Sequence, residues 1–204
     1  MLNNILKQKQ TRVIEEPNFI KQLFNNPRFS VIWLAVRVWL GMQWIDAASH
    51  KINNPAWTET GDALKGYWTS AVAIPETGRP AITFGWYRDF LQTLIDAEAY
   101  TWFAKLVAFG ELFIGIALIA GAFVGIAAFF AGFMNWNFMM AGSASSNPLL
   151  FAAAVGLILA WKIAGYIGAD YFLLNWLGTP WNRSQTVETE SSPNPELSGA
   201  LAGD

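Results

Sequence analysis

Residues 106–141 read LVAFGELFIGIALIAGAFVGIAAFFAGFMNWNFMMA, and Glu111 is the one ionisable side chain among these thirty-six residues. A single helix of this length would extend about 54 Å, whereas the hydrocarbon core of a bilayer is only about 30 Å thick. Gly121 and Gly125, near the middle of the stretch, are weak helix formers. The stretch therefore predicts a helical hairpin in lipid, with a carboxylate buried in its first arm.

The composition of the whole chain supports the same environment. Of its 204 residues 53% are hydrophobic and only 14% are charged, against roughly 25% charged in an average soluble domain. Eleven tryptophans suit the aromatic belts at membrane interfaces. We expect an integral membrane protein in contact with the lipid bilayer. Its polar first residues predict no signal peptide.

The scarcity of reactive side chains excludes several kinds of chemistry. The chain has no Cys, which excludes disulfides, iron–sulfur clusters and dithiol–quinone exchange. Its single His cannot supply bis-His haem ligation or a usual zinc site, so no metal or haem is predicted. No basic stripe suggests nucleic acid as a partner.

The hydrophobic pattern predicts an all-α membrane protein, a four-helix transmembrane bundle with short amphipathic helices in the first outer loop. Residues 1–28 are basic and the loop 51–99 is acidic, so the positive-inside rule places both termini in the cytoplasm. A 169–181 interfacial helix and a disordered 182–204 tail follow the last span. The predicted spans are about 29–50, 100–121, 125–141 and 148–168.

The outer loop carries apolar residues at helical spacing in two places, around Tyr67 and around Phe90. These predict two amphipathic helices on the outer surface, separated by the turn region from Pro75 to Pro80.

Charged residues inside the spans can be matched by depth. Arg37 lies about 12 Å and Glu111 about 14 Å from the cytoplasmic face, at about 1.5 Å per helical residue. This predicts a buried ion pair, Arg37–Glu111, which either fixes helix docking or serves function. By the same reasoning Asp46 matches Lys105 near the outer face.

Asn135 and Asn137 flank Trp136 in the third predicted span. They differ by about 200° around a helix, so they cannot both face the same partner. We expect one of them to form a hydrogen bond across the bundle. Both helix–helix association and ligand binding explain an intramembrane Asn.

The outer end of the first span gathers polar and aromatic residues. A His beside a carboxylate and ammonium groups can exchange protons or hold an anion, so His50, Asp46 and Lys51 are the candidate catalytic residues. Interfacial anchoring is the alternative explanation. The candidate substrate or quinone-binding residues around them are Trp44, Trp57, Trp102 and Lys105.

Several short patterns occur in order along roughly residues 30–175. They are Arg37, Gly41, Trp44, Lys51, Pro55 and Trp57, then Gly110-Glu111, Gly115, Gly121, Met134-Asn135, Ala141-Gly142, Asn147-Pro148, Gly165, Gly168 and Asp170. In order and spacing this set resembles the DoxX/DoxD family. Ala48 departs from the pattern, since the family has Gly there.

The resemblance implies a function similar to that of the large subunit of thiosulfate:quinone oxidoreductase. In that reading the chain is a membrane subunit of a quinone-linked oxidoreductase in a bacterial or archaeal cytoplasmic membrane, with quinone as its possible cofactor. Because the chain has no evident electron carrier, a second protein subunit is expected. The alternative is a non-catalytic accessory or scaffold subunit of a larger respiratory or photosynthetic complex.

Overall fold

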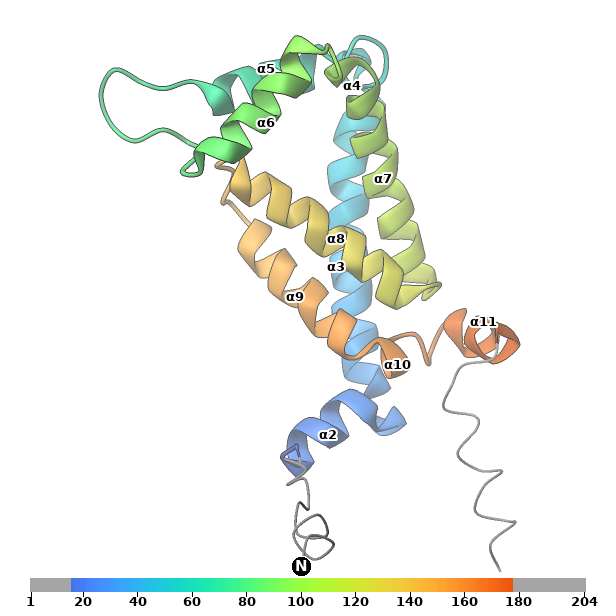
Figure 1. Ribbon diagram of the computed structural model, residues 1–204. Helices are drawn as coiled ribbons and strands as arrows, with labels where there is room; N and C mark the ends of the chain where they lie inside the picture. Colours follow the sequence, from blue (N-terminus) through green and yellow to red (C-terminus); the bar gives the residue numbers. More distant parts are fainter. Residues whose placement is uncertain (1–15, 178–204) are drawn as a thin grey trace, which may run out of the picture.

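The structure is a computed structural model that describes residues 16–177, and within that range it is all-helical (Figure 1). Three predicted parts lie outside the described residues. They are residues 1–15 of the basic segment, residues 178–181 of the interfacial helix, and the 182–204 tail.

Two long helices, α3 (Ser30–Ile52) and α7 (Tyr100–Ala120), pack side by side in opposite directions (Figure 1). They touch at Gly41 and Gly115, where a Cβ on Gly115 would lie 2.9 Å from the Gly41 carbonyl oxygen. Small residues thus permit the close approach. Both helices are long and apolar enough to cross a membrane.

The turn predicted inside 106–141 is present. It follows α7, with Gly121 and Phe123 in the left-handed region at φ 71° and 50°, and α8 (Val124–Met140) begins directly after it. Gly125 lies inside α8 rather than in the turn, and there it packs against Trp161. The prediction that two helices separated by a turn occupy this stretch is therefore confirmed.

The second pair of helices is α8 and α9 (Asn147–Leu159), and α9 is continued after Ala160 by α10 (Trp161–Ala164). This pair runs obliquely across α3 (Figure 1). Asn147 is the first helical residue of α9, and its side-chain amide donates to the Ser143 carbonyl at 2.8 Å. With 17 and 13 residues, α8 and α9 are apolar but shorter than typical spans.

The end of the α3–α7 pair that carries α4 (Pro55–Thr58), α5 (Asp62–Val72) and α6 (Gly85–Asp96) is called the loop end (Figure 1). The two helices predicted in the outer loop are α5 and α6. They do more than cover the surface, because they have a hydrophobic core of their own. Its buried residues are Leu64, Trp68, Ala71, Ile82, Tyr87, Leu91, Tyr100, Ala104 and Ala141.

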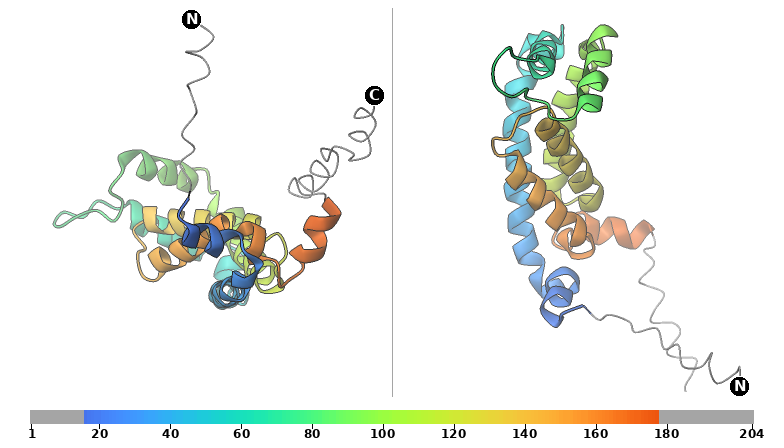
Figure 2. Two further views of the ribbon diagram at one scale, coloured as in Figure 1. Left: turned by 90° about the horizontal axis from the view of Figure 1, so that it is seen from below. Right: turned by 60° about the vertical axis from the view of Figure 1, so that its left-hand side comes forward.

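The opposite end, called the terminal end, carries α2 (Asn18–Asn25), the short η1 (Pro27–Phe29) and α11 (Asp170–Leu177) (Figure 2). α2 is fastened by the Trp33 indole, which donates to the Leu23 carbonyl at 2.8 Å. α11 falls within the predicted 169–181 helix.

Large apolar side chains cover the outward faces of α7, α8 and α9. Soluble monomers rarely expose a contiguous apolar patch of more than a few hundred Å². These faces therefore indicate contact with lipid or protein. Examples are Phe109, Phe113, Ile116, Ile126, Phe129, Phe130, Phe133, Leu149 and Leu159.

Candidate ligand site at the loop end

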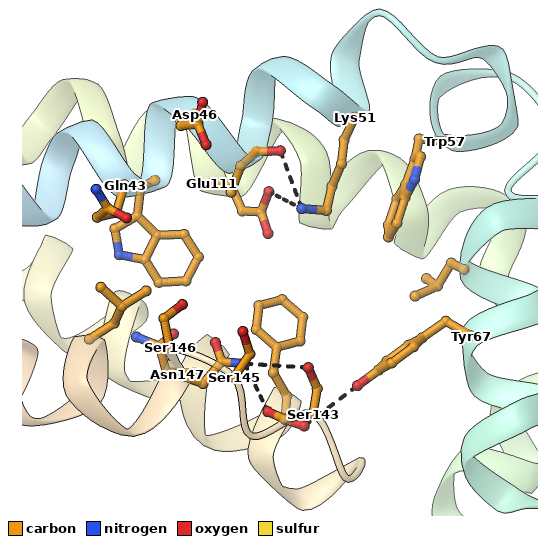
Figure 3. A pocket seen from close by; sticks show the side chains of 16 residues that line it. Gln43, Asp46, Lys51, Trp57, Tyr67, Glu111, Ser143, Ser145, Ser146 and Asn147 are labelled. Atoms are coloured by element: carbon orange, nitrogen blue, oxygen red, sulfur yellow. Dashed lines mark hydrogen bonds and ion pairs between the residues drawn. The ribbon is translucent and has the colours of Figure 1, made fainter.

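A cavity of about 390 Å³ lies where α3, α4, α5, α7, α8, the α8–α9 loop and the start of α9 meet, and each of these segments except α4 contributes a polar side chain to its lining (Figure 3). Its size falls in the range of small-molecule sites, roughly 300–1,000 Å³. The polar residues that line it are Gln43, Asp46, Lys51, Tyr67, Glu111, Asn135, Ser143, Ser145, Ser146 and Asn147.

The charged centre of this cavity is an ion pair. The Lys51 ammonium lies 2.8 Å from Glu111 Oε2, and it also donates to the Ala47 carbonyl at 3.3 Å. The Trp57 ring faces the ammonium, with 5.3 Å between Nζ and the ring centroid. The Glu111 side chain is only 1% exposed, whereas that of Lys51 is 19% exposed. The pair is thus reached from the Lys51 side.

The predicted Arg37–Glu111 pair is wrong, because Glu111 is paired with Lys51. Matching depths does not suffice, since side chains on a helix lean toward its own N-terminus. α3 and α7 are antiparallel, so Arg37 leans to the terminal end and Glu111 leans to the loop end. Lys51 is near the end of α3 at the loop end, and its side chain leans back along α3 toward the terminal end. It therefore meets the Glu111 side chain, which leans toward the loop end.

Arg37 is instead part of the terminal end. It is 1% exposed, and its Nη2 donates to the Ile167 carbonyl at 2.8 Å. A Cβ on Gly121 or Gly168 would collide with the guanidinium, so both glycines make room for it. Arg37 thus fastens the 165–169 segment to α3 and lies against Gly121 in the α7–α8 turn, while its Nε and Nη1 atoms are buried without a hydrogen-bond partner.

Asp170 completes this arrangement and attracts the Arg37 guanidinium. The Asp170 carboxylate accepts hydrogen bonds from the backbone N–H of Phe123 at 2.5 Å and of Val124 at 2.9 Å. These donors belong to the N-terminus of α8, where a negative charge is favoured.

Asn135 and Trp44 leave polar atoms unpaired beside the cavity. Asn135 is fully buried, and neither its amide nitrogen nor its amide oxygen has a hydrogen-bond partner. The indole nitrogen of Trp44 is likewise buried without a partner. Both residues line the cavity. Because an unpaired buried amide costs about 1–3 kcal/mol, these atoms favour a ligand that can pair with them.

Within the described residues, the bond that was expected across the bundle from one of the two asparagines is not formed; Asn137 instead bonds to α6, a helix of the outer loop. Its side-chain oxygen accepts from the Tyr87 hydroxyl at 3.0 Å. Its side-chain nitrogen donates to the Phe133 carbonyl at 2.8 Å. Asn137 is therefore a helix-docking residue, and Asn135 is the one that faces the cavity.

Five predicted residues line this cavity together: Asp46, Lys51, Trp44, Trp57 and Glu111. The other four predicted residues, Arg37, His50, Trp102 and Lys105, are not part of its lining.

His50 is exposed and its Nδ1 lies 2.8 Å from the Asp46 carbonyl oxygen of its own helix. Trp102 is 56% exposed and Lys105 is exposed. Within residues 16–177 no ion pair joins Lys105 to Asp46.

Sequence reasoning missed the wall contributed by Tyr67 and the α8–α9 loop, residues 143–147. The polar run Gly-Ser-Ala-Ser-Ser-Asn at 142–147 was the available signal, and it was interpreted only as a turn. Burial raises the pKa of the Tyr67 hydroxyl above its ordinary value, so this group stays a neutral hydrogen-bond donor.

The cavity can exchange hydrogen bonds and protons with a small ligand. Asp46 and Glu111 supply two carboxylates against the one ammonium of Lys51, so the charge balance disfavours a free anion. In the described part of the chain, no cluster of three or more His, Asp or Glu residues could hold a metal ion.

Taken by fold and site, the described chain is an all-helical protein with two helices of membrane-spanning length and a buried polar cavity. Comparison with protein-family models, with curated proteins and with solved structures finds no match. The DoxX/DoxD resemblance is therefore still a prediction from the sequence.

Proposed function

We propose that the chain is a multi-pass protein of a bacterial or archaeal cytoplasmic membrane, with α3, α7, α8 and the α9–α10 segment crossing the bilayer. The apolar outward faces of α7, α8 and α9 support this. Lys21 and Arg28 at the terminal end favour a cytoplasmic location for that end. The loop end then faces outward.

In this proposal the chain is the membrane subunit of a quinone-linked oxidoreductase. The observation that carries it is the fully buried, unpaired Asn135 amide beside the Lys51–Glu111 pair. A quinone ring is neutral and accepts hydrogen bonds at its carbonyl oxygens. Lys51, the Asn135 amide and the Trp44 indole are suitable donors, and Glu111 can accept from the hydroxyl of the reduced quinol.

The reduction of quinone to quinol consumes two electrons and two protons. Glu111 is placed to exchange one proton with the ring, and the exposed Asp46 leads from the cavity to water. The electrons come from a sulfur oxyanion such as thiosulfate, oxidised by the expected second subunit. The cavity has two carboxylates and one ammonium, and this net negative charge argues against oxidation of the sulfur oxyanion inside it.

Quinone binding is tested by titrating the purified protein in detergent with a decyl-substituted benzoquinone and following the quench of tryptophan fluorescence. We expect saturable binding that is weakened at least tenfold in Lys51→Ala. His50→Ala is the matched control one residue away, and it should bind normally because His50 is outside the cavity. Equal affinities of wild type and Lys51→Ala would contradict the proposal.

A non-catalytic accessory subunit is the second candidate, and one surface favours it. Ile74, Phe84 and Trp86 are 69%, 52% and 59% exposed. They lie in the projecting segment between α5 and α6 and at the start of α6 (Figure 1). Such a patch suits a partner protein. Stoichiometric co-purification with a respiratory or photosynthetic complex, lost in Trp86→Ser but without quinone binding by the pure chain, would favour this candidate.

A further inference from the structure

A second cavity, of about 580 Å³, lies between α5, α6, α7 and α8. Its walls are almost wholly apolar, with Leu91, Val107, Ile114 and Met134 among the lining residues. Three polar side chains lie in the wall. The Tyr87 hydroxyl and the Asn137 side chain are bonded to each other at 3.0 Å, and the Tyr67 hydroxyl lies 3.5 Å from the Phe138 carbonyl oxygen. The cavity therefore offers a ligand nothing polar to bind, and it suits a hydrocarbon chain.

Several residues that line this cavity are strongly exposed: Leu106 at 58% and Phe113 at 67% on α7, Phe130 at 50% and Phe133 at 52% on α8, and Phe90 at 47% on α6. Those on α7 and α8 belong to the same apolar outward faces that the proposal places in lipid. A hydrophobic ligand could thus enter sideways from the hydrocarbon region.

The apolar and the polar cavity are neighbours. Leu64, Tyr67 and Phe138 line both, so one layer of side chains separates them. In this layer the Tyr67 hydroxyl lies 3.5 Å from the Phe138 carbonyl oxygen and also interacts with the Ser143 side chain. On α7, Gly110 lines the apolar cavity and the next residue, Glu111, lines the polar one.

We propose that the apolar cavity holds the prenyl tail of a quinone whose ring is bound at Lys51 and Glu111, and that the quinone enters between α7 and α8. This inference rests on the quinone-binding function proposed above and adds to it a tail-binding chamber and a route. The chain in this picture discriminates quinones by their tails as well as by their rings.

Gly110 provides the means to fill the chamber. It lies inside α7 with an ordinary helical conformation, and a Cβ there would meet only the Met134 sulfur, at 3.9 Å. A large side chain at position 110 would therefore extend into the apolar cavity. Gly66 on α5 is the matched control, because it is exposed and a Cβ there meets nothing within 4 Å.

The experiment measures the affinity of wild type, Gly110→Phe and Gly66→Phe for a dimethoxy-methyl-benzoquinone with and without a decyl tail, in one detergent. We expect wild type to bind the decyl form at least tenfold more tightly, since burial of about two methylene groups suffices for that. Gly110→Phe should lose this preference and keep its affinity for the tail-less ring, which also shows that it is folded. Gly66→Phe should behave as wild type.

The tail inference would be overturned if Gly110→Phe still preferred the decyl form. It would also be overturned if Gly110→Phe and the smaller Gly110→Leu both lost affinity equally for the decyl and the tail-less form. In either case the binding of the ring by wild type would still stand. Mass spectrometry that finds a phospholipid displaced by Gly110→Phe, with decyl-quinone affinity unchanged, would overturn it in favour of an acyl chain. If wild type binds neither quinone, the proposed function itself fails.

Discussion

The α3–α7 pair carries a buried charge at each end, and the two surroundings differ in kind. At the terminal end, the groups bound by Arg37 and Asp170 are backbone atoms of the 165–169 segment and of the α7–α8 turn. At the loop end, Glu111 is bound by the side chain of Lys51 and faces a cavity beside the unpaired Asn135.

The comparison separates two uses of a buried charge. A carboxylate such as that of Asp170, which is occupied by backbone donors, fixes the fold, because moving it would leave helix-terminal groups unsatisfied. A charge that meets a side chain at a cavity can change its partner when a ligand arrives. Depth in the membrane alone does not distinguish these cases. The identity of the contacting atoms does.

The largest effect is expected at the terminal end. Asp170→Asn replaces a carboxylate that accepts two backbone hydrogen bonds at the start of α8, and it leaves Arg37 without the attraction of that charge. We expect a loss of about 3 kcal/mol in the free energy of unfolding, measured by denaturant or thermal unfolding in detergent. Asp46→Asn, which alters an exposed carboxylate, should change little. Equal stability of Asp170→Asn and wild type would contradict the claim that the charges at the terminal end hold the fold together.

A pH effect is expected from the packing of α6 at the loop end. Burial raises the pKa of Tyr87 to about 12, above the ordinary value of about 10. The neutral, buried Tyr87 therefore contributes fully to the free energy of unfolding below pH about 10. As the pH rises toward about 12 the free energy of unfolding falls by about 2–3 kcal/mol in all.

Thermal unfolding as a function of pH measures this loss. Tyr87→Phe should be less stable than wild type at neutral pH, since it loses the bond to Asn137, and it should show a weaker alkaline decline. An alkaline decline of equal size in both proteins would show that other groups are responsible.

A smaller effect is expected from the ion pair at the loop end. Glu111→Gln keeps the shape of the side chain, and the Lys51 ammonium that it leaves is still 19% exposed. We expect it to cost about 1 kcal/mol in the free energy of unfolding and to weaken quinone binding at least tenfold. If Glu111→Gln destabilised the protein as much as Asp170→Asn and left quinone binding unchanged, the buried charges at both ends of the α3–α7 helix pair would serve the fold alone.

The helices were predictable from the sequence and the contacts between their charges were not. Hydrophobic runs place α3, α7 and α8 within two residues of the expected bounds, since hydrophobic burial is read directly from composition and period. The fourth helix begins where it was expected, but α9 ends at Leu159 and only the short α10 follows it, so its predicted end at residue 168 was wrong. The Arg37–Glu111 prediction used depth but not the direction in which each side chain leans.

The candidate site was predicted in part for a related reason. Glu111 attracts attention because a charge inside an apolar stretch is unusual, and Lys51 and Trp57 were noticed as part of a polar and aromatic cluster at the end of the first span. Asn135 was noticed, but its unpaired state depends on what the neighbouring helices offer. The wall from Ser143 to Asn147 follows α8, and its position depends on how α8 packs on α9. The hydrophobic periodicity of the sequence does not reveal that packing.

The most direct measurement pairs stability with binding in Asn135→Leu. Leu has a similar volume and needs no hydrogen bonds, so it removes an unpaired buried amide. The account predicts that the ligand-free variant is as stable as wild type or more stable, by up to about 1 kcal/mol, while its affinity for a tail-less benzoquinone falls at least tenfold. A variant that is several kcal/mol less stable and binds the quinone as wild type does would contradict the account, because Asn135 would then serve the fold and not a ligand.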